Sequence, residues 1–595
     1  MSDSDMTWDI TSIVSGASIE EVRSALQEAV DATEALAKKH FGNIDSMNPK
    51  EILVLMKEYE ALFVRLMDLS LYCRLSFDAN SMDKTAGQLR QWGDQARAKF
   101  DEIIVPMRLV LGKRIHENRS IVEDPALSDY RHYLEKWAAW APYNLSEEEE
   151  RLVKAKDLNG IALVSQLRSA WISEKTFDVE ILGDRKTLPY SSFSALRMNP
   201  NREIRRMASS TLYGSLRDDR LLHAYALRSI CADHLEMSLR RKMPSPMTQS
   251  FLDQDVDMET IASLLAAIEN TTDHYHEFLR LKAKIMGLDK LAGYDVIAPI
   301  TEETSWTFDW LQAKEIAADS FQSFDNEIGA VVEDMFRGRR IDAANRMGKR
   351  DGAFCAPWYE KRKSFVHTTY NETLADLSTL AHELGHGVQN HFAFRDQTSL
   401  SRSPGSCLAE MGSIFGELLL AERILTMSES KEQKIEILGE ILSRYFYVAY
   451  YVSMRALFEK SVYEAIEDGK LIDADTACQL WQDARHRIFG DSVDWNKAEY
   501  MEYEWARIPH FYKANFRFYN YSYSFAQMLV FALYQAYKEG GDDFVERFKK
   551  LLGIGGSMSP HDQLLEFGYN IADPKFWELG TKQAKRFLKQ LQELL

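Results

Sequence analysis

Apolar residues recur at helical spacing along most of this chain. Stretches in which they return every three or four positions predict amphipathic helices, and the longest cover residues 18–39, 49–71, 258–286 and 431–468. Only 14 of the 595 residues are proline, and no low-complexity tract or fixed-period repeat interrupts the pattern. The pattern therefore predicts a mainly α-helical protein, long enough for several hydrophobic cores or one large two-lobed body.

Two interruptions indicate how these helices are divided. Ala141–Asn144 is a short break between helices, too brief for a domain linker. Leu182–Pro189 is rich in turn-forming residues and predicts a turn or hairpin. We therefore expect a helical N-terminal domain over residues 1–185 and a second domain over residues 186–595.

One predicted helix of the second domain, residues 377–392, contains the motif His382-Glu383-Leu384-Gly385-His386. At about 100° per residue, His386 lies about 40° from His382, and Glu383 lies about 100° from it. The apolar residues fall on roughly the opposite face: Leu377, Leu380, Ala381, Leu384 and Val388. One face would pack while the other stays free to hold a metal ion.

The motif has the composition of a zinc hydrolase. Residues four apart stand on one face of a helix, so His382 and His386 can bind one zinc ion while Glu383 acts on a zinc-bound water. His391 falls within the apolar stripe, and we expect it to be a packed side chain, not a ligand. Gly385 and Gly387 each cost a helix about 1 kcal/mol relative to alanine, which indicates that something approaches the backbone closely there.

A catalytic zinc site needs a third protein ligand, and Glu410 is the best candidate. It lies in a helical pattern over residues 407–420, which follows a loop rich in breakers. Asp396 is a weaker alternative because its local sequence indicates a loop. Glu417 shares a helical face with Glu410, and the pattern allows two interpretations: a hydrogen-bond acceptor for a ligand histidine, or a solvated surface charge.

These residues resemble the M3 metallopeptidases, a family that includes thimet oligopeptidase, neurolysin and bacterial oligoendopeptidase F. The resemblance covers most of the chain from about residue 50 onward, and it includes the following stretches: 127–134, 145–150, 291–299, 348–355, 365–371 and the HExxH motif with Glu410, Ser413 and Glu417. It implies a two-lobed helical zincin fold like that of neurolysin, with a deep substrate channel and a small β-sheet beside the active-site helix. It also implies one zinc ion per chain and short, unstructured oligopeptides as substrates.

A second cluster of polar aromatic residues follows near the C-terminus, between Ile508 and Phe525. In an extended segment Tyr519, Tyr521 and Tyr523 would share a face, whereas on a helix Tyr521 would point away from the other two. The resemblance to oligoendopeptidase F implies that His510 and Tyr521 donate hydrogen bonds in the transition state. Tyr519 and Tyr523 would line the substrate site, and a shift of the tyrosine register by two positions fits the family almost as well.

A predicted strand before the zinc helix supplies a substrate-binding hypothesis. Residues 365–370 favour β-structure and resemble the family's edge strand, with which an extended peptide would pair through main-chain hydrogen bonds. His367 on this strand is therefore expected to contact substrate. Gln389 is also expected to do so, since it stands where the family often has a histidine three residues after the second ligand.

The bulk properties restrict the partners. The net charge of −18 argues against binding nucleic acid. No apolar run is long enough for a transmembrane helix, and the first eight residues lack the apolar core of a secretion signal. Five scattered cysteines without a CxxC pair fit reduced thiols. We expect a cytoplasmic protein that binds neither nucleic acid nor membranes; the sequence carries no signal for its oligomeric state.

Three functions remain in competition. The favoured one is a zinc endopeptidase with Glu383 as general base. A zinc carboxypeptidase on a related helical fold would need a positive group for the terminal carboxylate of its substrate, and the sequence alone does not place one. A catalytically silent peptide-binding protein would not require Glu383.

Overall fold

The chain folds into two compact units, each assembled from three separate stretches. The computed structural model describes residues 6–181, 183–300, 306–514 and 516–595. The first five residues, part of the stretch in which no secretion signal is expected, and Leu182 of the predicted turn lie outside the described residues. Unit 1 comprises Met1–Pro142, Ser305–Met427 and Ala536–Tyr569. Unit 2 comprises Tyr143–Thr304, Ser428–Gln535 and Asn570–Leu595. These units differ from the two consecutive domains expected from the sequence, because the N-terminal helices share a unit with the HExxH helix.

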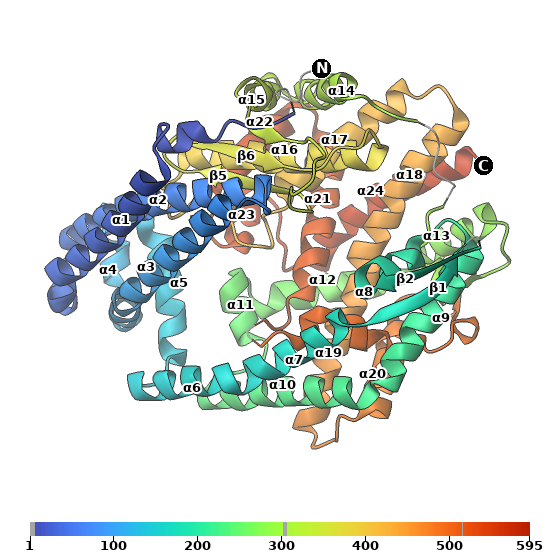
Figure 1. The fold of residues 1–595 in the computed structure, drawn as a ribbon, viewed down its shortest axis with the longest axis horizontal. Helices are drawn as coiled ribbons and strands as arrows, with labels where there is room; N and C mark the ends of the chain where they lie inside the picture. The colour runs from blue at the N-terminus through green and yellow to red at the C-terminus, as the bar shows by residue number, and fades with distance from the viewer. Residues whose placement is uncertain (1–5, 182, 301–305, 515) are drawn as a thin grey trace. The chain divides into compact units, whose positions relative to one another are not determined.

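Unit 1 combines the N-terminal helices with the zinc-motif helix and a small sheet (Figure 1). Its helices and strands are α1 (Ile19–His40), α2 (Pro49–Ala79), α3 (Lys84–Glu117), α4 (Ser120–Glu123), α5 (Arg131–Trp140), α14 (Trp310–Gln322), α15 (Asn326–Arg337), β4 (Ile341–Asp342), β5 (Phe354–Trp358), β6 (Lys363–His367), α16 (Leu374–Asp396), α17 (Met411–Met427), α22 (Asp542–Ile554) and α23 (Pro560–Glu566).

The N-terminal helices of unit 1 are amphipathic, as their apolar spacing predicts. Ser18 and Asn48 cap α1 and α2 with reciprocal capping boxes, which satisfy backbone N–H groups at each helix start. The inward faces of α1, α2, α3 and α5 form one hydrophobic cluster in which Leu55, Met107 and Leu134 are fully buried. This cluster stabilises the long helices by removing their apolar faces from water.

The sheet of unit 1 has three strands in the order β4-β6-β5. β6 pairs in parallel with β4 and antiparallel with β5. The predicted strand at residues 365–370 is therefore a central strand, and the prediction that it forms the edge is wrong. Figure 1 shows α16 among β6, α15, α17 and α22, and all of these elements pack against it. The small sheet beside the HExxH helix is thus confirmed, with β4 and β5 as its edge strands.

Unit 2 is also mainly helical. Its helices and strands are α6 (Glu147–Asn159), α7 (Ile161–Ser173), β1 (Thr176–Ile181), β2 (Asp184–Pro189), α8 (Tyr190–Ala195), α9 (Arg202–Asp218), α10 (Arg220–Arg240), α11 (Thr248–Gln254), α12 (Met258–Asn270), α13 (Thr272–Ile285), β3 (Leu291–Ala292), α18 (Lys431–Phe446), α19 (Val452–Glu467), α20 (Ala474–Phe489), β7 (Val493–Asp494) and α24 (Pro574–Glu593). Helix α21 (Asn520–Gly540) crosses the division between the units.

Two of the long predicted helices in unit 2 are interrupted. The run at residues 258–286 is divided into α12 and α13 at Thr271, whose hydroxyl donates to the carbonyl of Ala267. The run at residues 431–468 contains a π-helical turn at Tyr447–Tyr451 between α18 and α19. The predicted hairpin is confirmed for its described residues, since β1 and β2 pair antiparallel.

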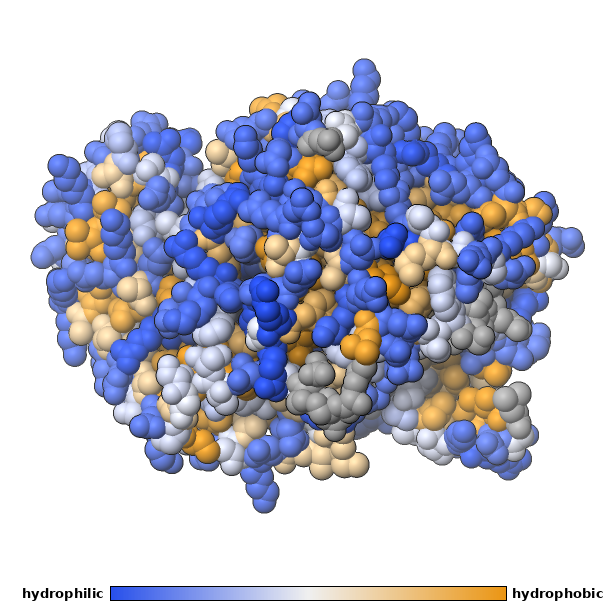
Figure 2. Space-filling view, turned by 90° about the horizontal axis from the view of Figure 1, so that it is seen from above, coloured by the Kyte–Doolittle hydropathy of each residue, from blue (hydrophilic) through white to orange (hydrophobic). Residues whose placement is uncertain are grey.

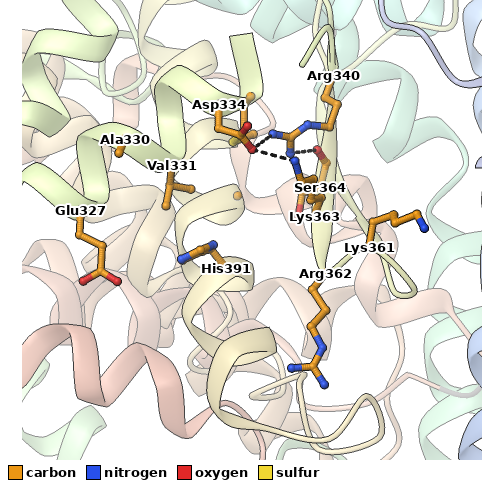
Figure 3. A pocket seen from close by; sticks show the side chains of 12 residues that line it. Glu327, Ala330, Val331, Asp334, Arg340, Lys361, Arg362, Lys363, Ser364 and His391 are labelled. Carbon is orange, nitrogen blue, oxygen red and sulfur yellow. Dashed lines mark hydrogen bonds and ion pairs between the residues drawn. The ribbon is translucent and has the colours of Figure 1, made fainter. Parts of the chain in front are cut away.

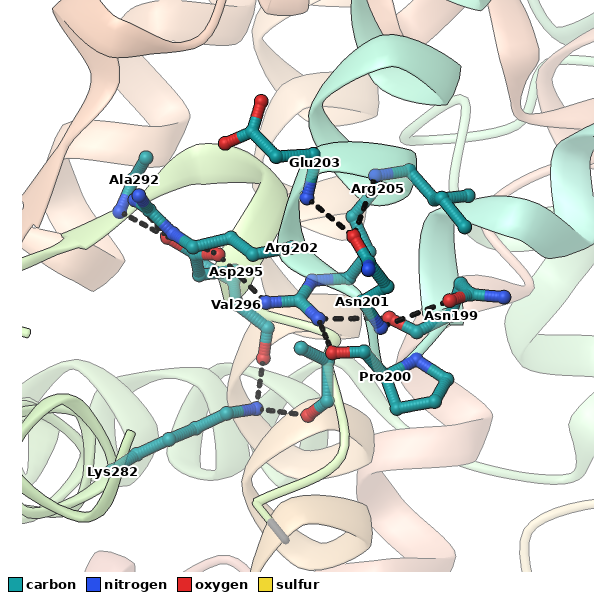
Figure 4. Close-up of polar contacts among 12 residues, drawn as sticks. Asn199, Pro200, Asn201, Arg202, Glu203, Arg205, Lys282, Ala292, Asp295 and Val296 are labelled. Carbon is teal, nitrogen blue, oxygen red and sulfur yellow. Dashed lines mark hydrogen bonds and ion pairs between the residues drawn. The ribbon is translucent and has the colours of Figure 1, made fainter. Parts of the chain in front are cut away.

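A buried charge network stabilises the interior of unit 2 (Figure 4). The carboxylate of Asp295 pairs with Arg202 at 2.9 Å and with Arg205 at 3.0 Å, and it accepts the backbone N–H of Ala292. Lys282 donates to the carbonyl oxygens of Val296, at 2.8 Å, and Ala298. These contacts satisfy charged groups that would otherwise be costly to bury.

The face of the molecule seen in Figure 2 is predominantly hydrophilic, with apolar groups scattered among charged ones. Among the described residues, no helix combines the length and the apolar composition that crossing a bilayer requires.

Candidate active site

The HExxH motif lies on α16, a helix fixed at its start and buried along one side. The Thr373 hydroxyl accepts the N–H of Asp376 at 3.1 Å, and the Asp376 carboxylate accepts the N–H of Thr373 at 3.2 Å, which forms a capping box. The predicted apolar face is fully buried at Leu377, Leu380, Ala381 and Leu384. The rings of His382 and His386 lie with centroids 4.8 Å apart, so the helix presents both imidazoles together, as its 3.6-residue period requires.

The two glycines of α16 allow other groups to approach the helix. A Cβ atom on Gly385 would lie 2.2 Å from the carbonyl oxygen of Gly412, and one on Gly412 would lie 2.4 Å from the carbonyl oxygen of Gly385. The backbones of α16 and α17 are therefore in direct contact, and the close approach predicted at Gly385 is confirmed. Gly387 makes similar room for the side chain of Met335 on α15.

The contact between α16 and α17 brings Glu410 to the two histidines. Glu410 directly precedes α17, which begins at Met411. Its Oε2 atom lies 3.2 Å from Nε2 of His382 and 3.5 Å from Nε2 of His386. One ligand atom from each of the three side chains lies within 4.8 Å of the others.

This donor set fits zinc. Two ligands about 2.0–2.1 Å from a tetrahedral zinc ion are roughly 3.3 Å apart, which agrees with the Glu410–histidine distances of 3.2 and 3.5 Å. Two imidazoles and one carboxylate also form a recognised catalytic set that leaves one position open. Asp396, the alternative ligand, is not in this cluster and pairs with Arg395 at 2.7 Å.

Glu417 and Ser413, both on α17, hydrogen-bond to His382 and Glu410 and so orient these candidate ligands. Nδ1 of His382 hydrogen-bonds to the Glu417 carboxylate, so that Nε2 is the atom turned to Glu410. Of the two interpretations of Glu417, the structure favours the hydrogen-bond acceptor. The Ser413 hydroxyl donates to Oε2 of Glu410 at 2.7 Å.

Burial and neighbouring charges shift the pKa values of the cluster in different directions. Burial raises the pKa of Glu410, but the hydrogen bond from His382 and the histidine charges outweigh it and lower that pKa to about 2. Burial lowers the pKa of His386 to about 4. Burial also disfavours protonation of His382, yet its hydrogen bonds to Glu410 and Glu417 raise its pKa to about 10. A metal ion held by Nε2 of His382 would compete with a proton for that nitrogen.

Glu383 points its carboxylate into the same site without a protein partner. The side chain is 5% exposed, and its Oε2 atom is buried with no hydrogen bond. Burial raises the pKa of Glu383 to about 7. A buried carboxylate that lacks a protein donor is suited to exchange a proton with a bound water.

A cavity of about 370 Å³ opens onto these residues. It is lined by His382, Glu383, His386 and Glu410, by the edge strand β5 at Phe354, Cys355 and Pro357, and by the loop after α16 at Arg402, Ser403 and Pro404. Its size is typical of small-ligand sites. The edge strand that borders the active site is therefore β5, a role that the sequence analysis gave to residues 365–370.

Gln389 and His367 have roles other than the predicted substrate contacts. Gln389 borders the cavity, but its side-chain amide hydrogen-bonds to the main chain and not to groups in the cavity. Its Nε2 atom donates to the carbonyl of Leu408, and its Oε1 atom accepts the N–H of Gly412, both at 2.9 Å. It therefore connects α16 to the segment that carries Glu410. His367 is 0% exposed, stacks on Phe354 and hydrogen-bonds to a backbone carbonyl. Its side chain is therefore packed within the protein, and the prediction that it contacts substrate is wrong.

The C-terminal aromatic cluster lies in unit 2 and gathers around His510. Nε2 of His510 is 3.3 Å from the hydroxyl of Tyr523, and its ring is stacked on Tyr519 with centroids 6.3 Å apart. Because α21 begins at Asn520, Tyr519 and Tyr523 fall on one side, as the helical interpretation predicted. Burial lowers the pKa of His510 to about 4, which keeps the imidazole neutral at pH 7.

Tyr521 is separated from this cluster. It is 0% exposed, and its hydroxyl lies 2.9 Å from that of Ser250 in the interior of unit 2. The assignment of a transition-state hydrogen bond to Tyr521 is therefore corrected: the tyrosines beside His510 are Tyr519 and Tyr523. The difference arises from the helical phase, which turns Tyr521 inward.

A second cavity of about 400 Å³ lies on another side of α16 and is lined by His391 (Figure 3). His391 is half-buried there and is not part of the metal cluster, in keeping with its predicted exclusion from the ligands. Asp334 on the cavity wall pairs with Arg340 and with Lys363, the latter at 3.2 Å. The charges of this cavity are thus largely compensated within the protein.

Arg402 lines the active-site cavity but is not among the site residues expected from the sequence. It lies in a loop with no periodic pattern, and its position follows only from the tertiary contacts of that loop. The nearest signal in the sequence was the breaker-rich stretch around it.

Comparisons with known proteins identify the family of this chain. The sequence profile described as peptidase family M3 matches residues 195–582, and the profile described as oligopeptidase F matches residues 118–169. An oligoendopeptidase F homologue of Lactococcus lactis subsp. lactis is 23% identical over 99% of this chain and 97% of its own length.

Solved structures share the fold along the whole chain. A Chlamydophila abortus protein described as a peptidase superposes with a TM-score of 0.88 at 20% identity, over 100% of this chain and 99% of its own. The oligoendopeptidase F of Enterococcus faecium superposes with a TM-score of 0.69 at 19% identity, over 97% and 98% of the two chains. Since the M3 profile covers well over half of the sequence, the chain belongs to peptidase family M3.

Proposed function

We propose that this M3 peptidase is a zinc-dependent endopeptidase that hydrolyses internal bonds of short, unstructured peptides. The observation that carries the proposal is the meeting of His382, His386 and Glu410 beside the unpartnered carboxylate of Glu383 in one cavity. His382, His386 and Glu410 would hold the ion. When bound, zinc supplies Lewis-acid chemistry and lowers the pKa of a coordinated water toward about 7.

The protein's own groups account for the proton transfers. The Glu383 carboxylate accepts a proton from the attacking water as the new carbon–oxygen bond forms at the scissile carbonyl. It then delivers that proton to the nitrogen of the leaving amine as the carbon–nitrogen bond breaks. The pKa of about 7 given to Glu383 by burial suits a group that must both accept and release a proton near neutral pH.

His510 and Tyr523 are proposed as hydrogen-bond donors to the oxygen that gains charge in the transition state, with Tyr519 beside them. Their mutual packing supports this assignment, because the rings of His510, Tyr519 and Tyr523 all contact one another, with centroids 5.3–6.3 Å apart. Removal of one such donor typically lowers the rate about 10²–10³-fold. The cluster belongs to unit 2 and the proposed metal ligands belong to unit 1.

The edge strand β5 is proposed to pair with the backbone of an extended peptide. Strand addition depends on main-chain hydrogen bonds and therefore tolerates varied side chains. Pro357 removes one donor from this edge, so the pairing would be interrupted at that residue. The five free cysteines support a reducing compartment, and we propose a cytoplasmic location.

The proposal is tested by zinc analysis together with a quenched fluorescent peptide blocked at both ends. We expect one zinc per chain and internal cleavage by the wild type. Glu383→Gln should retain zinc and lose turnover by at least about 10²-fold, because the substituted amide takes up no proton.

Two results would overturn the proposal. Full turnover by zinc-loaded Glu383→Gln would show that Glu383 is not the general base. Cleavage confined to peptides with a free C-terminus, and only of the last residue, would instead indicate a carboxypeptidase.

A further inference from the structure

Arg402 is the feature of the active-site cavity that the proposed chemistry does not use. Among the described residues that line this cavity, it is the one cationic side chain apart from the two metal-site histidines. The acidic residues there, Glu383 and Glu410, are committed to proton transfer and to the metal. No carboxylate of the protein that lines the cavity is therefore left to pair with the charge of Arg402.

The loop that carries Arg402 is held in place by tight main-chain contacts. The N–H of Gly556 donates to the carbonyl of Ser401 at 2.7 Å. A Cβ on Gly555 would lie 2.7 Å from the carbonyl oxygen of Arg402, and one on Gly556 would lie 2.1 Å from that of Ser403. Gln397 adds a side-chain hydrogen bond to the carbonyl of Gly553 at 2.9 Å. Arg402 is thus placed by a fixed backbone, unlike a mobile surface arginine.

The guanidinium group is oriented but its charge is not neutralised. It donates to Oδ1 of Asn390 and, at 3.4 Å, to the hydroxyl of Tyr359. The rings of Tyr359 and Phe394 lie 5.3 and 5.2 Å from its central carbon. No carboxylate of the described residues forms an ion pair with it. Both of its hydrogen-bond acceptors are neutral, and its Nε atom is buried without a partner.

Two other arginines of unit 1, the buried Arg340 and the half-buried Arg346, have their charges compensated by carboxylates. Arg340 in the second cavity pairs with Asp334, and Arg346 pairs with both oxygens of Asp342 (Figure 3 shows the first pair). Burying an unpaired charge is costly. Arg402 instead donates to the neutral amide oxygen of Asn390, where the other two arginines have a carboxylate. The amide nitrogen of Asn390 donates in turn to the hydroxyl of Ser364 at 3.0 Å.

We propose that Arg402 binds a carboxylate of the peptide substrate and thereby sets a preference among the peptides that this enzyme cleaves. The inference rests on the proposed function. A planar guanidinium with unused N–H groups matches a carboxylate, and a rigid mount favours such recognition. Two groups of a peptide carry this chemistry, the C-terminal carboxylate and the side chain of Asp or Glu.

The test compares cleavage rates within matched peptide pairs. One pair differs only in a free or amidated C-terminus, and a second, amidated set differs only in Glu or Gln at each position around the scissile bond. A charged hydrogen bond of this kind predicts a preference of about ten- to hundredfold for one acidic member. Preference within the first pair identifies the C-terminus as the ligand, and preference within the second identifies a side chain.

Three variants assign that preference to Arg402. Arg402→Gln should bring the ratio of kcat/KM values within the responding pair close to one. Asn390→Asp keeps the shape of the site but supplies an internal carboxylate, so it should also reduce the ratio while Arg402 remains in place. Arg65→Gln, which removes an exposed arginine paired with Glu28 at 2.7 Å, is the control and should leave the ratio unchanged.

A binding measurement separates this inference from the proposed function. With Glu383→Gln, the ratio of Kd values within the responding pair should show the same preference, and adding Arg402→Gln should remove it. Equal ratios in the wild type, Arg402→Gln and Asn390→Asp would overturn the role of Arg402 while leaving the peptidase intact. If Arg402→Gln does not fold, Asn390→Asp alone decides. Absence of internal cleavage of every peptide by the zinc-loaded wild type would instead overturn the proposed function.

Discussion

At the scale of single residues, the metal centre depends on the partner behind each ligand. His382 has two ring nitrogens, and the hydrogen bond between Nδ1 and Glu417 decides which of them faces Glu410. The carboxylate also makes the imidazole a stronger base and hence a better ligand. Ser413 plays the corresponding part for Glu410, by donating to its Oε2 atom.

The role of Glu417 predicts a specific loss. Glu417→Gln should keep the shape of the side chain but remove its charge, and weaken zinc binding about ten- to hundredfold. Competition with a fluorescent chelator measures this change. Glu333→Gln, on the exposed face of α15, is the matched control. Equal zinc affinity in Glu417→Gln and the wild type would show that Glu417 does not support the ligand.

The residues of the site were predictable from sequence to unequal degrees. His382, Glu383 and His386 are separated by fixed helical angles, so their common face followed from spacing alone. Tyr521 was misassigned because its direction depends on the residue at which α21 begins. Arg402 was missed because its placement depends on Gly555 and Gly556, more than 150 residues later in the chain.

At the scale of elements, the contact between α16 and α17 determines how Glu410 lies relative to the two histidines of the proposed metal site. Gly385 and Gly412 allow the two backbones to touch, and Gln389 joins the helices next to that contact through two hydrogen bonds. Glu410 lies between Leu408 and Gly412, the two residues to which Gln389 is hydrogen-bonded. The distance between Glu410 and the histidines is therefore set by a helix–helix contact that has no room for a methyl group.

This contact predicts a large effect of a small substitution. In Gly385→Ala the new Cβ would lie 2.2 Å from the carbonyl oxygen of Gly412, so the helices must separate. We expect the Gly385→Ala protein to lose its zinc and its free energy of unfolding to fall by about 1–3 kcal/mol. Metal analysis and thermal unfolding measure the two effects.

Gly87→Ala is the matched control, because a Cβ there meets nothing within 4 Å on helix α3. It should be neutral or stabilise the protein, by up to about 1 kcal/mol. A zinc-replete Gly385→Ala protein of normal stability would mean that α16 and α17 are not held by this contact.

For the sheet of unit 1, the sequence predicted that a strand exists but not which strand forms the edge. Residues 365–370 favour β-structure and predict a strand, and the observed strand β6 covers Lys363–His367. Which strand forms the edge depends on the partners of β6, and one of these is β4, a strand of only two residues paired in parallel. So short a partner leaves no periodic signal, and β5 was therefore overlooked as the border of the active site.

At the scale of the whole molecule, each unit is assembled from three stretches of the chain, and all proposed metal ligands belong to unit 1. His382, His386, Glu410 and the supporting Glu417 lie between residues 382 and 417. Binding of zinc would therefore stabilise unit 1 directly, since a ligand stabilises the folded part that binds it.

This division predicts an uneven response to metal removal. Treatment with a chelator should increase hydrogen exchange in α16 and α17 while leaving α9 and α10 of unit 2 close to their original protection. Exchange measured by mass spectrometry, with and without zinc, resolves these helices. A uniform increase across both units would contradict the assignment of the metal to unit 1 alone.

The interleaved order of unit 1 has a consequence for the protein during its synthesis. Helix α22 packs against α16, and the Gly555–Gly556 pair holds the loop beside the active site. The ribosome makes these supports more than 150 residues after the HExxH motif. A nascent chain thus carries the HExxH motif long before it can assemble the surrounding site, which must wait until α22 and the Gly555–Gly556 pair have been synthesised.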